Sequence, residues 1–393
     1  MTHRNDASFR TLFLLALAGF VSGASMRVAD PLLPTLASEF GARVRDAAYV
    51  LTAFTAAYGV FQAIHGPLGD RFGKLRVISL GMMAAALAAA GCALSAHLPT
   101  LITFRFLTGM TAGAVIPLSL AFIGDKVSYA GRQALLGRFI AGTLLGQSFG
   151  PLIGGVLSDT LGWRATFVVL AVAFLVVGVM LARERHAIGD KGSGTYTPPW
   201  QRYGAMLRSE KARPVLGTVG IEGFLFFGAF GFVGTYLKQQ FGLSDTLAGL
   251  VVAGFGVGGL TYSFVVGRLV RRLGETGLVL YGGITLLLCF FFTAVAPSAW
   301  LAAPFVVVMG FGFYMLHNTL QVRATEMAPE ARGSAVSFFA LSMFVGQAVG
   351  VAVYGWLGEH AGYRGPFVVT GVALLLLALR FRTRLIRLGT VRR

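Results

Sequence analysis

The sequence from Gly66 to Arg76 reads GPLGDRFGKLR, a short basic turn between two long apolar runs. These runs cover approximately residues 47–68 and 75–96. A helix that crosses a membrane needs about 20 mainly apolar residues, and both runs reach that length. The stretch therefore predicts two membrane-spanning helices joined by a tight polar turn.

The same alternation of apolar runs and short polar turns continues along all 393 residues, 55% of which are hydrophobic and 12% charged. Soluble domains have roughly 45–50% apolar and about 25% charged residues, so a water-soluble globular protein is excluded. The first run is expected to stay in the protein instead of being cleaved as a signal peptide, because its apolar pattern continues to Leu36. The pattern predicts an all-α membrane protein with twelve transmembrane helices, at approximately 11–36, 47–68, 75–96, 99–123, 133–157, 163–182, 214–236, 244–266, 277–296, 299–321, 334–358 and 363–379.

The net charge of +17 is concentrated in the turns and tails between the apolar runs. If the N-terminus is cytoplasmic, 26 of the 33 Lys and Arg residues fall on the cytoplasmic side, as the positive-inside rule expects. We therefore expect a multi-pass protein of the inner (plasma) membrane with both termini in the cytoplasm, and the lipid-facing composition excludes a nucleic-acid binder. Cys92 and Cys289 each lie inside an apolar run, so neither a disulfide framework nor a thiolate metal site is expected.

An internal repeat divides the chain. Gly146, Gln147, Gly150 and Gly155 recur 200 residues later as Gly346, Gln347, Gly350 and Gly355, and GWRATF at 162–167 recurs as GYRGPF at 362–367. One polar, basic connection, 183–213, is much longer than the others. The sequence thus predicts an N-terminal six-helix half (1–182), a cytoplasmic linker (183–213) and a C-terminal six-helix half (214–393).

Two six-helix halves in the same orientation, together with the first turn, resemble the major facilitator superfamily, in which the substrate site lies between the halves near the middle of the membrane. The family's loop motif is matched by Gly66, Asp70, Arg71, Gly73 and Lys74. The resemblance implies that the two glycines permit a tight turn and that the Asp70 carboxylate lies against the positive N-terminal end of a helix from the other half, as a conformational latch. Asp125 is expected to brace this latch by pairing with Arg71 or Lys74. The alternative is an ordinary basic turn.

The fifth apolar run carries GxxxGPxxGG, and it resembles the helix motif of the family's exporters and antiporters through Gly137, Gly146, Gly150, Pro151, Gly154 and Gly155. Glycines at every fourth position make a smooth groove that another helix can approach, and proline permits a kink. Export is therefore favoured over import. The alternative is generic close helix packing.

Charged residues inside membrane spans are functional candidates. Asp30, followed by Pro34, and Arg105, within FRFLTG, resemble the family's acid in helix 1 and arginine in helix 4. Both helices line the central path in the family, so the resemblance makes Asp30 and Arg105 a candidate pair for proton coupling. The alternative is that Asp30 merely pairs with Arg27 at the outer interface.

Glu222 lies inside the seventh apolar run, among phenylalanines that include Phe226 and Phe230. An acid beside aromatic faces suits an organic cation. The alternative is that Glu222 stays protonated and bonds a neighbouring helix, while the phenylalanines face lipid. Three polar residues of the tenth run are further candidates for substrate binding: His317, Asn318 and Gln321.

We therefore predict a secondary active transporter that exports small lipophilic or drug-like compounds in exchange for protons, by alternating access, and works as a monomer. Its partners would be the small-molecule substrate, protons and the lipid bilayer, with the proton gradient as energy source and no cofactor or metal. Export of a polar metabolite such as a sugar or amino acid is the alternative, with Asn318, Gln321 and Gln347 as its candidates. A membrane-embedded enzyme is disfavoured because the sequence has no phosphate-binding loop, HExxH or CxxC.

Overall fold

The computed structural model describes residues 9–126, 129–188, 212–327 and 332–387, all in helices and short connections. Eleven helices among these residues are long and apolar enough to cross a membrane. One of them, α14 (Asp245–Val295), has 51 residues, which at about 1.5 Å per residue is far too long for a single crossing. Its backbone leaves helical geometry at Gly274, and counting its two arms separately turns the eleven helices into the twelve that the sequence predicts.

Contacts with one short helix show that α14 doubles back at Gly274. Lys238 of α13 (Val233–Phe241) bonds Asp245 at the start of α14, and Tyr236 of α13 donates a hydrogen bond to the Ala294 carbonyl at its end, 2.9 Å away. The two ends of α14 therefore lie together, so its arms are antiparallel.

The N-terminal half begins with a broken first span made of α1 (Phe9–Arg27), the 3₁₀ turn η1 (Asp30–Leu32) and α2 (Leu33–Glu39). Pro31 and Pro34 lie at the start of η1 and α2, where a missing backbone donor is tolerated. The other five spans are α3 (Val44–Ala47) with α4 (Tyr49–Phe72), α5 (Lys74–Ala93), α6 (Leu98–Ala112) with α7 (Val115–Lys126), α8 (Tyr129–Leu161) and α9 (Trp163–Ile188).

The C-terminal half repeats this plan. Its first span is also broken, into α11 (Ala212–Glu222), the π-helical turn η2 (Gly223–Phe227), α12 (Gly228–Phe230) and α13. The two arms of α14, then α15 (Ala299–Glu326), α16 (Arg332–Ala361) and α17 (Arg364–Arg387) complete it. Most of the predicted linker lies outside the described residues, while α9 continues to Ile188 and α11 begins at Ala212.

The sequence repeat is also a repeat in backbone conformation. The described residues with positive φ are six glycines, which form three pairs at the offsets of the repeat: Gly41 with Gly242, Gly73 with Gly274, and Gly162 with Gly362. Gly73 makes the turn after α4 with φ 95°, whereas Gly66 lies inside α4. The turn therefore depends on Gly73, and the expectation that Gly66 also shapes it is not met.

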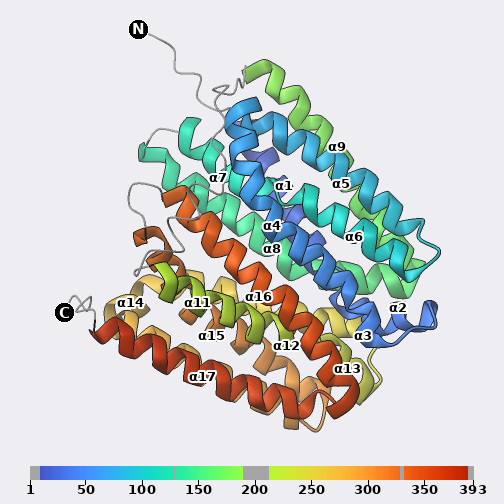
Figure 1. Cartoon of the computed structure of the whole chain (residues 1–393), viewed down its shortest axis with the longest axis vertical. Helices are drawn as coiled ribbons and strands as arrows, with labels where there is room; N and C mark the ends of the chain where they lie inside the picture. The colour runs from blue at the N-terminus through green and yellow to red at the C-terminus, as the bar shows by residue number, and fades with distance from the viewer. Residues whose placement is uncertain (1–8, 127–128, 189–211, 328–331, 388–393) are drawn as a thin grey trace.

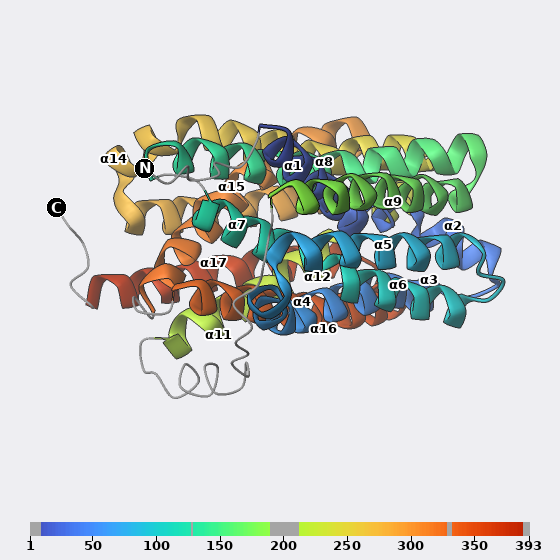
Figure 2. The same cartoon turned by 90° about the horizontal axis from the view of Figure 1, so that it is seen from above.

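Two helix pairs make the most extensive contacts between the halves: α8 packs against α14, and α4 packs against α16. The view from above shows these two contacts on opposite sides of the bundle (Figure 2). Along the bundle axis, the start of α1 and the end of α17 lie at one end, and α2, α3 and α13 lie at the other (Figure 1). We call these the terminal end and the distal end.

Candidate functional site

The first polar group of the interface between the halves is an acid–base pair at the break in the first span. The Arg27 and Asp30 side chains are 2.8 Å apart and almost completely buried. Sequence reasoning expected Asp30 to pair with Arg105 and kept Arg27 as the alternative; the structure places Asp30 against Arg27. The pair lies in the interior of the bundle instead of at an exposed outer interface.

Arg105 of α6 is also fully buried, and backbone oxygens hold it. Its guanidinium donates to the carbonyls of Ser25 at 3.1 Å and Val50 at 3.4 Å, and it lies 4.1 Å from the centre of the Phe54 ring. Its Nη2 atom has no hydrogen-bond partner among the described residues. Arg105 therefore ties α1 to α4 beside the Arg27–Asp30 pair without touching Asp30 directly.

The second polar group lies in the C-terminal half. Glu222, at the last residue of α11, is fully buried, and its Oε2 atom is 2.7 Å from Nδ1 of His317 on α15. The other carboxylate oxygen, Oε1, is buried without a hydrogen-bond partner among the described residues. Two residues singled out separately in the sequence are thus brought together as a second acid–base pair, and Glu222 does bond a neighbouring helix.

Aromatic rings connect the two acid–base pairs. The Arg27 guanidinium lies 4.7 Å from the Phe230 ring centre, and Phe230 stacks on Phe226 at 5.4 Å. Phe226 contacts Phe313 at 4.4 Å, and Phe313 stacks on His317 at 4.9 Å. We call Phe226, Phe230, Phe313 and His317 the aromatic column. Phe226 and Phe230 are at most 1% exposed, so the alternative that they face lipid does not hold for them.

The remaining polar candidates do not join this column. The Asn318 side-chain amide donates to the Tyr262 hydroxyl at 3.3 Å, and Gln321 is exposed. Gln347 of α16 is buried. The three residues proposed for a sugar or amino acid therefore have three different environments.

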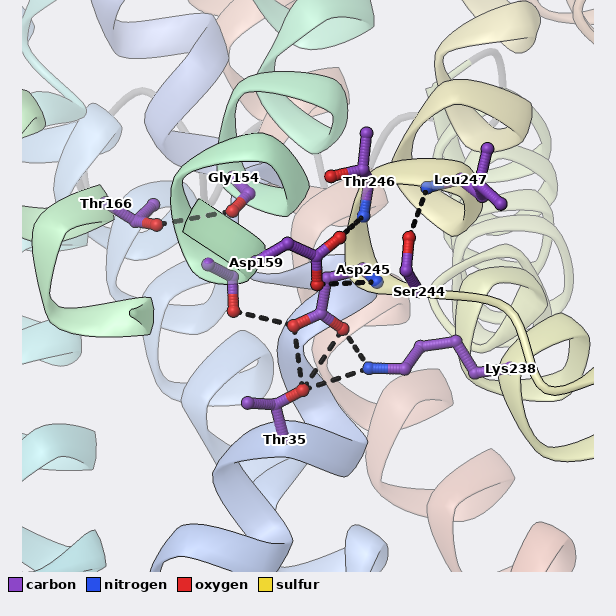
Figure 3. Close-up of polar contacts among 10 residues, drawn as sticks. Thr35, Gly154, Asp159, Thr166, Lys238, Ser244, Asp245, Thr246 and Leu247 are labelled. Carbon is purple, nitrogen blue, oxygen red and sulfur yellow. Dashed lines mark hydrogen bonds and ion pairs between the residues drawn. The ribbon is translucent and has the colours of Figure 1, made fainter. Parts of the chain in front are cut away.

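Polar contacts at the distal end join the halves around Asp245, the first residue of α14 (Figure 3). The Asp245 carboxylate accepts hydrogen bonds from Thr35 of α2 at 2.8 Å and from Ser158 of α8 at 2.6 Å, and it pairs with Lys238. In return, Asp159 of α8 accepts from the backbone amides of Asp245 at 3.2 Å and Thr246 at 2.7 Å. An acid of one half therefore caps a helix of the other half.

The internal repeat places a second acid at the equivalent position. Glu359 of α16 stands 200 residues after Asp159, and it pairs with Arg43 at 3.2 Å and Arg45 at 3.0 Å. These two arginines flank Val44, where α3 of the opposite half begins. We call the contacts of Asp159 and Glu359 with the opposite half the distal seam. It bridges the halves at both the α8–α14 and the α3–α16 junction at this end.

The predicted latch residues lie at the opposite, terminal end. Lys74 Nζ is 3.4 Å from Asp70 and 2.7 Å from Asp125, so Asp125 braces the turn through Lys74, while the Arg71 guanidinium lies 4.9 Å from the Phe72 ring centre. Residues 328–331, which precede α16 of the other half, lie outside the described residues. The contact of Asp70 with a helix of the other half stays a prediction.

The glycines of α8 form helix contacts. A Cβ atom at Gly146 would overlap the carbonyl oxygen of Phe20 on α1, one at Gly154 would overlap that of Val28 just after α1, and one at Gly150 would lie 2.7 Å from the Ala24 carbonyl. Gly155 meets Asp245 of α14 in the same way, and Pro151 lies inside the helix against Gly249. Gly137 has open space around it. Close packing thus accounts for every glycine of the motif except Gly137.

Sequence reasoning missed the role of Arg27 and the residues of the distal seam. Arg27 was expected only as an alternative partner of Asp30 at the outer interface, and its aromatic partners, Phe227 and Phe230, are about 200 residues away in the sequence. Asp159 and Glu359 carried a usable signal, since both are acids at the same offset as the glycine repeat.

The chain is similar in sequence to a family of known proteins and in fold to solved structures. The profile of the Major Facilitator Superfamily matches residues 15–334. The chain is 26% identical to the chloramphenicol resistance protein of Streptomyces lividans, over 95% of this chain and 96% of that protein. It is 24% identical to the multi-drug resistance efflux pump PmrA of Streptococcus pneumoniae, over 93% and 94%. A crystal structure of the peptide transporter POT in complex with sulfate has the same fold, with a TM-score of 0.79, 16% identity, and coverage of 96% and 94%.

Proposed function

Because the chain belongs to the Major Facilitator Superfamily, and is thus a membrane transporter and not an enzyme, we propose that it exports small lipophilic or drug-like compounds in exchange for protons. The substrate would pass between the two halves by alternating access. The basic residues in the turns at the terminal end support a cytoplasmic location for both termini.

The observation that carries proton coupling is the presence of two buried acid–base pairs on opposite halves, joined by the aromatic column. A buried carboxylate beside a basic group can bind or release a proton when a rearrangement changes its partner or its access to water. Arg27–Asp30 and Glu222–His317 both have this composition. Because the pairs belong to different halves, relative movement of the halves changes their surroundings.

The aromatic column supports a lipophilic substrate. Ligand sites for such compounds are lined mainly by hydrophobic and aromatic side chains with a few fixed polar groups. Phe226, Phe230 and Phe313 supply the rings, and the two acid–base pairs supply the polar groups. The names of the two bacterial relatives, a chloramphenicol resistance protein and a multi-drug efflux pump, support the same class of substrate.

The distal seam supports alternating access. Its contacts tie α8 to α14 and α3 to α16 in this structure, so a path between the halves is closed at this end. Opening there must break contacts of Asp159 and Glu359, while the turn that holds Asp70 lies at the other end. The two ends can thus open in alternation.

The test is substrate-dependent proton movement in liposomes that contain the purified protein, measured over a panel of cationic lipophiles, neutral lipophiles and sugars. We expect lipophilic compounds to move protons and sugars to have no effect. Asp30→Asn should lose transport against a gradient but keep energy-independent exchange, because the amide keeps the volume of the side chain but does not titrate. Since this change leaves the buried Arg27 guanidinium without its counter-ion, the double variant Arg27→Gln with Asp30→Asn is measured beside it. Glu39→Gln is a control, since Glu39 is an acid at the distal end that pairs with Arg164 of its own half and, among the described residues, has no contact in the distal seam. Transport that ignores the proton gradient would overturn the proposal.

A further inference from the structure

Arg27 makes contacts with both halves of the molecule. Its guanidinium is 2.8 Å from Asp30 of its own half, and it also lies 4.7 Å from the ring centre of Phe230 and 5.5 Å from that of Phe227, both in the other half. Arg27 is only 5% exposed. A cation over an aromatic ring is bound more strongly when water is excluded. Because Arg27 is buried, both of its cation–π contacts are stronger than such contacts at an exposed site.

The two kinds of partner respond differently to movement. Asp30 lies three residues after Arg27 and travels with it, whereas Phe227 and Phe230 belong to η2 and α12 of the opposite half. When the halves separate at this level, Arg27 keeps its carboxylate and leaves the rings. Two ring faces that held a cation are then uncovered along the path between the halves.

We propose that Phe227 and Phe230 form a binding site for an organic cation, and that Arg27 occupies this site as a tethered competitor whenever the halves are closed around it. This inference rests on the export function proposed above and specifies its substrate class. A substrate cation would take the place of the guanidinium over the rings, and the return of Arg27 would displace it.

The neighbouring groups define the kind of cation. Both nearby carboxylates already have a basic partner, Asp30 with Arg27 and Glu222 with His317, although Oε1 of Glu222 accepts no hydrogen bond from the described residues. The rings offer negative π-faces but no hydrogen-bond acceptors. The site thus suits a lipophilic monocation with a delocalised or quaternary charge, which needs no hydrogen bonds. The rings do not replace the hydration of a primary ammonium, so such a cation is expected to bind less well than a delocalised or quaternary one.

The charge balance of the site favours one positive charge over two. Arg27 contributes a single positive charge, and the Glu222 carboxylate, which is buried on the same half as the rings one helical turn before Phe226, is already paired with His317. A monocation replaces Arg27 over the rings charge for charge. A dication would place a second buried charge beside Arg27 and Arg105, which are both already desolvated.

The experiment measures binding of tetraphenylphosphonium to the purified full-length protein in lipid nanodiscs. Arg27→Leu alone would leave Asp30 buried and unpaired, which destabilises proteins strongly. The informative variant is therefore the double replacement Arg27→Gln with Asp30→Asn, which removes the competitor and its counter-ion together. We expect it to bind tetraphenylphosphonium at least several-fold more tightly than the wild type, and to bind a neutral lipophile of similar size unchanged.

Two further variants test whether the rings carry the gain. Adding Phe230→Leu to the double variant should remove most of the increase, because the side chain stays apolar but loses its π-face. Should the double variant fail to fold, Arg27→Lys takes its place: a compact, strongly hydrated ammonium competes less well for ring faces than a guanidinium, so a smaller gain is expected. Unchanged or weaker cation binding in the folded variant, or a gain that survives Phe230→Leu, would overturn the inference.

The outcomes separate this inference from the proposed function. If neutral lipophiles move protons in liposomes while the double variant gains no cation binding, the export function stands and the tethered competitor is wrong. If cation binding rises as expected but no compound moves protons, the competitor stands and proton-coupled export is wrong.

Discussion

Removal of the negative charge of Asp159 should open the distal seam. Asp159 lies on α8 and accepts hydrogen bonds from the first two backbone amides of α14, those of Asp245 and Thr246, in the opposite half. The variant Asp159→Asn keeps the size of the side chain and one acceptor oxygen. It loses the second acceptor and the charge that faces the positive end of α14.

The expected change in free energy follows from the loss of the acceptor and the loss of the charge. A charge near an exposed helix N-terminus stabilises by about 0.3–1 kcal/mol, and a hydrogen bond contributes a net of about 0.5–1.5 kcal/mol. Asp159 is an exposed residue, so values at the lower end of both ranges apply. We expect the free energy that favours the closed seam to fall by about 1 kcal/mol, which changes the ratio of closed to open molecules about fivefold.

The assay is a distance measurement between spin labels on cysteines placed at Thr160 of α8 and Gln240 of α13. Both residues are exposed at the distal end and lie on opposite halves. The native cysteines, Cys92 and Cys289, are at most 1% exposed, so the labels should attach to the introduced sites. The population at the longer distance, relative to that at the shorter distance, should rise about fivefold in Asp159→Asn.

Glu39→Gln is the matched control for this measurement. It removes another exposed acid from the distal end, but Glu39 pairs at 2.7 Å with Arg164 of its own half and so does not hold the halves together. Its distance distribution should match that of the wild type. An unchanged distribution in Asp159→Asn, or an equal shift in both variants, would refute the assignment of Asp159 to the seam.

Three other changes have defined outcomes. Asp70→Asn should slow transport by about 2- to 30-fold at normal expression, since a charge at a helix N-terminus is worth about 0.3–2 kcal/mol; equal rates in a liposome assay would contradict the latch. Glu222→Gln should reduce export of cationic lipophiles more than that of neutral ones, measured as resistance of cells at matched expression, and equal losses would make Glu222 a packing or coupling residue. Gly146→Ala should lower the melting temperature of the purified protein, because the added methyl group would overlap the Phe20 carbonyl, whereas Gly137→Ala should leave it unchanged; similar melting temperatures would disprove the α1–α8 packing argument.

The transmembrane helices were predictable from the sequence because their causes are local. Apolar length fixes whether a segment can cross a membrane, and the turn at Gly73 follows from a glycine between two apolar runs. Its counterpart at Gly274 follows in the same way, although α14 is otherwise continuous there. The family assignment was also accessible, since the turn motif and the repeat are both visible in the sequence.

The site was only partly predictable. Glu222 and His317 were recognised as candidates because charge and polarity inside a membrane span are rare, but nothing in the sequence joins two residues that are 95 positions apart. The partner of Asp30 was expected to be Arg105, and the local neighbour Arg27 takes that place. The distinction depends on which way each side chain points, which residue spacing does not determine.

The sequence by itself determined the twelve spans, the two-fold repeat and the family, because these depend on hydrophobic length, on charge in turns and on short motifs. Only the tertiary structure decided which side chains meet between the halves. Arg27 reaches Phe227 and Phe230, and Asp159 reaches the start of α14, through packing of helices from different halves. Such contacts depend on the rotation and offset of each helix pair, and these are set by the sum of many small packing interactions along their whole length.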